Sequence, residues 1–314
     1  MIFISRTQTN PFFNIAAEEY VLKHFDEDVL MLWQSTPAVI VGKHQNMVAE
    51  VNLNYTRENR IPVIRRVSGG GTVFHDLGNL NYTLIKTEAN RERLIDFKKF
   101  SAPVMEFLRT LSIQAEFEGK NNLVINGKKF SGNSAHVLKN RVMHHGTLLF
   151  NTNLENLEKV IRPPKANIAD KAIKSVSATV TNISMELQST ITFEDFRQSL
   201  AAFLVDHYQI DNIYHFSEQD IAEINKLVAE KYNTPQWNYG YSPYYEFENT
   251  LDGFYLFIKV KKGLVEAIEL NGCENSFSGS FKGIMHRYQD INNIIERLNV
   301  KAETKKTLLR LFGF

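Results

Sequence analysis

The pattern of apolar and polar positions predicts a chain that mixes helices with many short strands. The first helix is expected to begin after Asn10, because Asn caps helices well and the apolar positions of NPFFNIAAEEYVLKHF then recur at helical spacing. A second helix is expected over 94–111, where Pro103 favours a kink. Runs rich in β-branched and aromatic residues predict strands at Val29–Gln34, Ala38–Lys43 and Asn79–Ile85.

From Leu123 onward the pattern predicts antiparallel hairpins. Asn126-Gly127 and Lys139-Asn140 are turn signals between strand-like runs, and such short connections join antiparallel pairs. Residues 161–182 have little periodicity and are expected to form a long loop, which in a compact domain often serves a function. Two amphipathic helices follow, with caps at Thr192 and Ser217.

A shift in composition towards Pro, Gly, Tyr and Asn over 233–247 favours a domain boundary. We expect a larger domain over 1–240 and a smaller one over 246–314, which contains a hairpin turning at Lys262-Gly263 and two helices from about Ile291. The predicted fold class is α+β, with a mostly antiparallel sheet flanked by helices and a small C-terminal α/β domain.

Composition and charge exclude several classes of protein. The 314 residues carry 36 basic and 35 acidic side chains, without a basic stripe that would favour nucleic acid. No segment reaches the ~18–20 apolar residues of a membrane span, and the N-terminus lacks the core of a signal peptide. The single cysteine, Cys273, excludes an internal disulfide. We therefore expect a cytoplasmic, soluble protein that binds neither nucleic acid nor membrane. We also expect a monomer.

The first candidate for chemistry is RRVSGGGTVFHDLGN, residues 65–79. Consecutive glycines present backbone N–H groups with no Cβ in the way, so they can cradle an anion such as phosphate. The stretch lacks the Gly-Lys-Ser/Thr of a P-loop and the helix of a dinucleotide-binding fingerprint. Because neighbouring strand side chains face opposite ways, only one of Arg65 and Arg66 is expected to face a ligand. A tight turn with a bulge is the alternative.

The second candidate is NGKKFSGNSAHVLKNRVMHHGTLLF. Lys129 and Ser131 share one strand face, and a lysine directed at the glycines would be a fixed positive charge beside a phosphate. The alternative is a solvated hairpin edge. His144 and His145 face opposite sides of a strand, and a zinc site that also uses His75 is disfavoured because no HExxH or cysteine spacing accompanies them.

Together the two stretches resemble the signature motifs of the lipoate–protein ligases, in the biotin/lipoate protein ligase family. RRVSGGGTVFHDLGN is similar to the family signature, GKKFSGNSAH to its lysine motif and HHGTLLFN to the strand that follows. NPFFNIAAEE, LMLWQ, VIVGKHQN and VTNI are further similarities, and WNYG stands where the family joins its catalytic domain to a C-terminal accessory domain. The resemblance implies the biotin/lipoate ligase fold, with the catalytic domain in 1–240 and the accessory domain in 246–314.

The resemblance also implies a reaction in two steps. (R)-Lipoate and ATP with Mg²⁺ give lipoyl-AMP and pyrophosphate, and a lysine of an apo lipoyl domain then attacks the anhydride. The implied acceptors are the E2 subunits of 2-oxoacid dehydrogenases and the glycine cleavage H protein. Lys129 matches the family's essential lysine, whose charge lowers the cost of bringing two anions together.

Other residues match the family's site by motif position. The match implies that ATP or the adenylate binds at Arg66, Gly71, Thr72, Val73, Phe74 and Lys129. It implies that lipoate binds at Trp33, Ser68, Gly69, Gly70, His75, Lys129, Ser131, Gly132 and His145. Asn122 stands where the family commonly has a metal-associated Asp, so Asn122 is the candidate residue near Mg²⁺. Ser177 and Thr179 stand where the family often has arginines.

Alternatives to a complete ligase stay open. The chain could instead transfer the acyl group from preformed lipoyl-AMP. The departures from the family motifs at Asn122, Ser177 and Thr179 are compatible with this alternative. A non-catalytic lipoate binder is disfavoured by the intact lysine motif, and a biotin ligase by the lipoate-type glycine loop. A thioester mechanism is disfavoured because Cys273 is far from both motifs in sequence.

Overall fold

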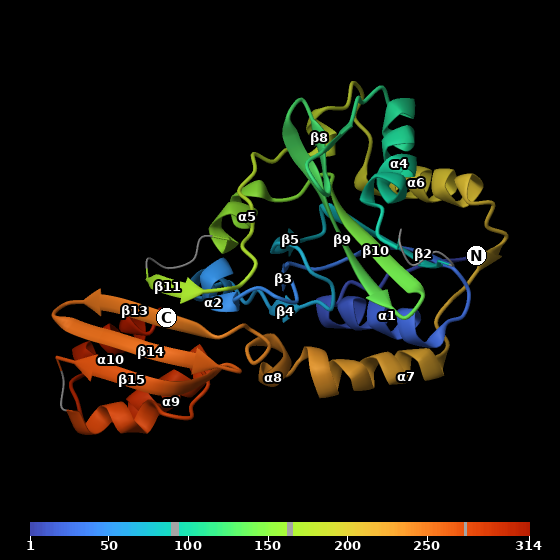
Figure 1. Ribbon diagram of the computed structural model, residues 1–314. Helices are drawn as coiled ribbons and strands as arrows, with labels where there is room; N and C mark the ends of the chain where they lie inside the picture. Colours follow the sequence, from blue (N-terminus) through green and yellow to red (C-terminus); the bar gives the residue numbers. More distant parts are fainter. Residues whose placement is uncertain (89–93, 162–165, 273–274) are drawn as a thin grey trace.

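Three β-sheets organise the part of the chain that the structure describes (Figure 1). This computed structural model describes residues 1–88, 94–161, 166–272 and 275–314. Cys273 lies outside these ranges, so the expectation that disfavours a thioester mechanism falls outside the described residues.

The strands are β1 Ile2–Ser5, β2 Val29–Gln34, β3 Ala38–Val41, β4 Val63–Arg65, β5 Val73–His75, β6 Asn79–Thr87, β7 Glu116–Glu118, β8 Asn122–Ile125, β9 Lys128–Leu138, β10 Arg141–Leu149, β11 Asn167–Asp170, β12 Asn212–Ile213, β13 Tyr245–Leu251, β14 Phe254–Lys261 and β15 Leu264–Asn271. The α-helices are α1 Pro11–His24, α2 Met47–Glu50, α3 Leu53–Glu58, α4 Phe97–Thr110, α5 Leu154–Val160, α6 Phe193–His207, α7 Glu218–Leu227, α8 Pro235–Asn238, α9 Tyr288–Arg297 and α10 Ala302–Leu311. Short 3₁₀ turns lie at Ile183–Met185 and Asn275–Phe281, and a π-turn at Val228–Tyr232 continues α7.

The main sheet has the order β12-β1-β2-β6-β10-β9-β8-β7. It is antiparallel except where β1 runs parallel to β12 and β2. Its two faces are both covered: Leu30 and Leu32 pack in the cluster with α4 and α6, and Met31 and Trp33 pack in the cluster with α1. Burial on both faces explains why the β2 segment is continuously apolar. The mostly antiparallel α+β prediction is confirmed.

The hairpin predictions are confirmed. Asn126 and Gly127 have φ values of 51° and 71°, which place both turn residues in the left-handed region typical of a tight hairpin between β8 and β9. Lys139, with φ of 57°, turns β9 into β10. The predicted helix over 94–111 forms as α4, and the caps predicted at Asn10, Thr192 and Ser217 all make their hydrogen bonds.

A small sheet of order β4-β3-β5 carries the glycine loop. β3 pairs in parallel with β4 and antiparallel with β5, so residues 66–72 must reverse the chain between the two edge strands. Gly70 has φ of +80°, a conformation that favours glycine. Its carbonyl oxygen would lie 2.1 Å from a Cβ at Gly42, so that position also has to be glycine.

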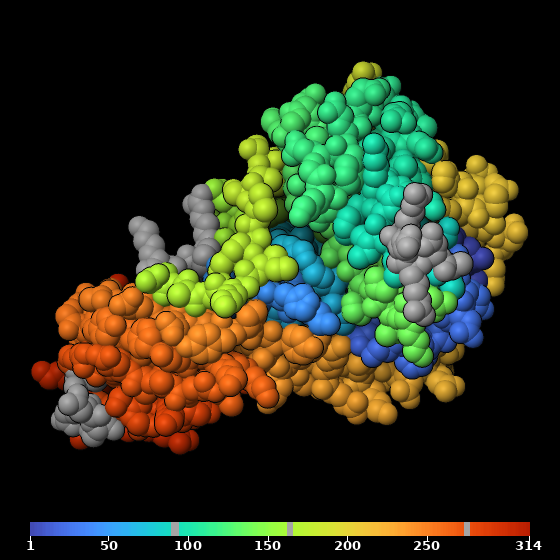
Figure 2. Space-filling view, viewed as in Figure 1, coloured from blue at the N-terminus to red at the C-terminus, as the bar shows by residue number. Residues whose placement is uncertain are grey.

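The third sheet, of order β11-β13-β14-β15, packs on α9 and α10. β11 lies inside the region expected to be a loop, and it pairs with β13 across some 75 residues of sequence. Residues 171–179, here called the strap, have no regular structure and connect β11 to the main sheet (yellow-green in Figure 2). The division into domains at 240 and 246 stays a prediction. No helix in the described ranges is long and apolar enough to cross a membrane.

Candidate functional site

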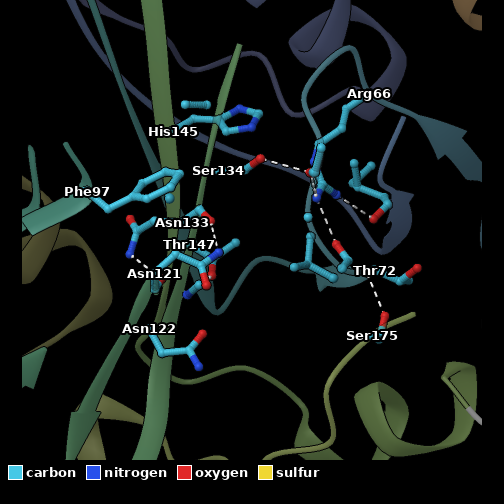
Figure 3. A pocket seen from close by; sticks show the side chains of 18 of the residues that line it. Arg66, Thr72, Phe97, Asn121, Asn122, Asn133, Ser134, His145, Thr147 and Ser175 are labelled. Carbon is cyan, nitrogen blue, oxygen red and sulfur yellow. Dashed lines mark hydrogen bonds between the residues drawn. The ribbon is translucent and has the colours of Figure 1, made fainter. Parts of the chain in front are cut away.

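A cavity of about 710 Å³ opens between the main sheet, the glycine loop and the strap. Its walls bring together most of the predicted site residues, namely Trp33, Arg66, Gly69, Gly70, Gly71, Thr72, Val73, His75, Asn122, Lys129, Gly132 and His145. The two candidate motifs, separated by about sixty residues of sequence, therefore face one space (Figure 3).

Three predicted site residues do not line the cavity. Phe74 is 1% exposed and packs in the cluster that contains Val39 and Val41. Ser131 is also 1% exposed and lies behind the wall, 3.5 Å from the amide nitrogen of Asn133. Ser68 is buried beneath the glycine loop. Their side chains support the walls of the cavity from behind.

Arg66 holds the glycine loop in shape. Its guanidinium donates to the carbonyl oxygens of Gly69 at 2.5 Å and Gly71 at 2.8 Å, and Nε donates to Ser68 Oγ at 2.9 Å. Burial lowers its pKa to about 10, so it stays charged at neutral pH. With these carbonyls drawn towards Arg66, the N–H groups of residues 69–71 make no hydrogen bond to any part of the chain that the structure describes. Free N–H groups beside a buried cation favour an anion.

Arg65 faces the other way, as the alternation along β4 predicts. It is fully buried, and its guanidinium donates to the carbonyl oxygens of Gly42, Lys43, Gln45 and Asn238 and to Ser242 Oγ, at 2.7 to 3.2 Å. Arg65 therefore fastens the small sheet to the segment that leads into β13.

Lys129 is the cation opposite the glycine loop. Burial and the charge of Arg66 lower the pKa of its ammonium. A Cβ at Gly132 would lie 3.1 Å from Lys129 Nζ, so this glycine leaves room for the lysine chain. The Lys129 N–H donates to Thr179 O at 2.8 Å, and Thr181 N–H donates to Lys129 O at 3.0 Å. In the described ranges no carboxylate forms a salt bridge with Lys129, which leaves its charge available for a ligand.

A buried chain of polar groups runs from Trp33 to the glycine loop. Trp33 Nε1 donates to Thr83 Oγ1 at 3.0 Å, and this hydroxyl donates to Glu18 at 2.5 Å. Glu18 meets His145 Nδ1 at 3.0 Å, and His145 Nε2 meets Ser68 Oγ at 2.6 Å. Burial acts to raise the pKa of Glu18, but His145 and Thr83 hold it below its usual value.

His75 and Glu18 are two buried ionisable residues near the Trp33 end of the site. Burial, with the charge of Arg66, lowers the pKa of His75 to about 3, so its ring is neutral where it meets Trp33 edge to face at 5.5 Å. Sequence reasoning missed Glu18. The signal in the sequence is a carboxylate inside a mostly apolar helix segment; the structure buries positions 13–22, where an unpaired charge would be costly.

The end of the cavity near Lys129 is lined by amides. Asn121 and Asn133 exchange hydrogen bonds between side chains and backbone, and Tyr82 Oη donates to Asn133 Oδ1 at 2.6 Å. Asn122 faces the cavity beside them. Within the described residues, no group of three or more His, Cys, Asp and Glu side chains could hold a metal. A single amide oxygen is a poor site for Mg²⁺, which prefers carboxylates, so these residues do not build a magnesium site of their own.

The strap closes one side of the cavity through Ser175. Thr72 N–H donates to Ser175 Oγ at 3.0 Å (Figure 3). Gln45 Nε2 also donates to Ser175 Oγ at 3.0 Å, and this hydroxyl donates to Glu50. Gln45 Oε1 also accepts from Thr72 Oγ1 at 2.9 Å. The contacts of Ser175 join segments 103 to 130 residues apart in sequence, so no local pattern could reveal them. Ser177 is exposed and does not line the cavity.

Comparisons with known proteins agree on one family. The family model for the lipoyl protein ligase A/B catalytic domain matches residues 10–205. Lipoate-protein ligase LplJ of Bacillus subtilis is 37% identical over 281 residues, or 87% of this chain and 85% of the relative.

Two solved structures share the fold. The P. falciparum protein LipL1, solved in complex with lipoate, has a TM-score of 0.65 and 23% identity over 98% of this chain and 99% of its own. A lipoate-protein ligase A bound with ATP has a TM-score of 0.65 and 24% identity over 77% of this chain and 100% of its own.

Proposed function

Because this chain belongs to the lipoyl protein ligase A/B family, we propose that it joins lipoate to protein lysines in an ATP-dependent reaction. The observation that carries the proposal is the ammonium of Lys129, which shares a cavity with the N–H groups of the glycine loop, both without a partner among the described residues. Relatives of the same fold have been solved with lipoate and with ATP, which supports both substrates.

The acyl chain of lipoate is proposed to lie against Trp33, Ile15 and Ile40 at the apolar end of the cavity. Each CH₂ buried there contributes about 0.8 kcal/mol, so this wall supplies much of the affinity. The carboxylate then points towards the glycine loop and Lys129. The proposed lipoate contacts of Gly69, Gly70, Gly132 and His145 are consistent with their places in the cavity wall.

The chemical step brings a carboxylate against the α-phosphate of ATP. Two anions repel, and Lys129 with Arg66 supplies fixed positive charge that needs no reorganisation at the moment of reaction. The N–H groups of Gly71 and its neighbours are proposed to bind phosphate oxygens. Mg²⁺ is proposed to arrive as part of the MgATP substrate, since no cluster of metal ligands is found within the described ranges.

The second step transfers the acyl group to a lysine of an apo lipoyl domain, such as an E2 subunit or an H protein. Alignment of the amine with the anhydride supplies most of the rate enhancement that this step needs. Neither a nucleophilic side chain nor a thioester is part of the proposal.

The test measures pyrophosphate release from lipoate and MgATP, with Lys129→Met beside the exposed control Lys128→Met. We expect lipoate-dependent release by the unmodified chain and the control, and at least a 100-fold loss in Lys129→Met with unchanged unfolding temperature. Retained release in Lys129→Met would exclude the proposed role of Lys129.

The second candidate is a transferase that uses preformed lipoyl-AMP. It is favoured by the amide at Asn122 and by the lack of arginines at Ser177 and Thr179. Mass spectrometry of an apo lipoyl domain distinguishes the two functions. Modification with lipoyl-AMP but not with lipoate and MgATP indicates the transferase, and modification in neither mixture excludes both.

A further inference from the structure

A second cavity, of about 270 Å³, is lined in part by Arg6, whose guanidinium approaches the Trp33 ring of the first cavity. It is lined by the end of β1 and the residues after it, by Phe13 of α1, and by α7 with the segment that leads into it. Its polar wall residues are Ser5, Arg6, Thr7, Gln8, His215 and Asn225. The described part of this wall carries no carboxylate.

Arg6 in this wall is buried, and its guanidinium has no hydrogen-bond partner in the part of the chain that the structure describes. The residue is 7% exposed, and its Nε, Nη1 and Nη2 atoms have no hydrogen-bond partner within the described residues. Its guanidinium lies between two rings, 5.4 Å from the centre of Trp33 and 5.9 Å from the centre of Phe216. The ring faces attract the cation but accept none of its five N–H groups.

No carboxylate among the described residues forms a salt bridge with the Arg6 guanidinium. Glu18 attracts it at longer range, but the Glu18 carboxylate is already bonded to His145 and Thr83 and forms no salt bridge with Arg6 among the described residues. A buried charge with unmet donors is costly, and such groups in proteins usually mark a missing ligand or water.

We propose that the second cavity binds a small molecule through an oxyanion, a carboxylate or a phosphate, that pairs with Arg6. The planar fork of a guanidinium matches both groups with two parallel hydrogen bonds. The Arg6 nitrogens are shielded from solvent, and Phe216 lines the cavity beside them, so the anion reaches them by displacing the Phe216 ring. At ~30 Å³ per water, the cavity has room for a ligand the size of about nine water molecules.

This site is independent of the proposed ligase activity, because it lies outside the first cavity. It is nevertheless coupled to that cavity through Trp33, whose ring contacts Arg6 and lines the first cavity. Pairing of Arg6 with an anion alters the charge against this ring. Trp33 is therefore a natural reporter of binding.

The first test is thermal unfolding of the full chain in sodium phosphate or sodium acetate, each against sodium chloride at equal ionic strength. We compare the unmodified chain with Arg6→Met and with the exposed control Arg109→Met. A saturable rise of ~3 °C or more is expected in at least one oxyanion for the unmodified chain and the control, and its loss is expected in Arg6→Met. The salt that produces the rise identifies the group that is bound.

Phosphate can also bind at the first cavity, and the variants separate the two sites. A rise that is equal in Arg6→Met and the unmodified chain places the anion elsewhere and overturns the proposal. The absence of a rise in both oxyanions overturns it as well.

A second measurement does not depend on whether Arg6→Met folds. In a Trp237→Phe background, Trp33 is the only tryptophan, and its emission is followed during the same titrations. We expect a saturable change and, in Arg6→Lys, a dissociation constant raised at least tenfold, because lysine keeps the charge but lacks the fork. An unchanged constant in Arg6→Lys refutes pairing with the guanidinium.

Discussion

Replacing Arg65 by Met tests whether this buried cation holds the small sheet to the segment before β13. The substitution removes six hydrogen bonds and leaves the carbonyl oxygens of Lys43, Gln45 and Asn238 without their donor, whereas that of Gly42 still accepts from the Gln45 N–H. Each buried acceptor left unpaired costs about 1–3 kcal/mol. Removing the buried charge also removes its desolvation cost and recovers part of this loss, so we expect a net loss of about 3–5 kcal/mol in the free energy of unfolding.

Chemical denaturation followed by circular dichroism measures this loss, with Arg109→Met as the exposed control. For a chain of this size we also expect a fall of roughly 10 °C in the unfolding temperature. The KM for ATP should rise, because Arg65 positions the backbone of Gln45, whose side chain contacts Thr72 and Ser175. A loss within about 1 kcal/mol of the control would refute the role assigned to Arg65.

Three further predictions concern the strap, the floor of the first cavity and acid stability. Ser175→Ala removes the bond from Thr72 N–H, so we expect the KM for ATP to rise roughly threefold to tenfold while Ser177→Ala has no effect. Gly146→Ala places a Cβ 2.2 Å from Asn133 Oδ1, and should cost about 1–3 kcal/mol in denaturant unfolding; an unchanged midpoint would contradict this packing. Burial lowers the pKa of His286 to about 4, below the ordinary 6.5, so between these values the unfolded chain binds more protons and stability falls as the pH falls. From pH 7 to 5 this residue contributes a loss of about 2 kcal/mol, which His286→Gln should remove in urea titrations at the two pH values.

Much of the fold was predictable because its signals are local. β2 has the bounds expected from its apolar run, the β8–β9 turn follows from Asn126-Gly127, and Asn10 caps α1 as its side chain allows. The alternation of side chains at the end of β4 also predicted that only one of Arg65 and Arg66 would face the cavity.

The remainder depends on contacts between distant parts of the chain. β11 has four residues and exists because it pairs with β13, so its own sequence carries little strand signal. Glu18 and Ser175 sit on a helix and a strap whose local patterns say nothing about the residues they meet. The places of Phe74 and Ser131 behind the wall likewise depend on packing that a motif does not encode.

The ends of the strap are fixed to two different sheets, and this limits the motions open to the molecule. Asp170 ends β11 in the third sheet, and Val180 bridges Lys129 in the main sheet. The ten residue steps between them (180 − 170) reach at most about 35 Å when fully extended. The strap therefore limits how far the third sheet can move from the main sheet. If the third sheet moves away, the strap is first straightened, and this withdraws Ser175 from the cavity. A larger displacement breaks the hydrogen bonds between β11 and β13 in succession. Closure of the cavity and the position of the third sheet are therefore coupled.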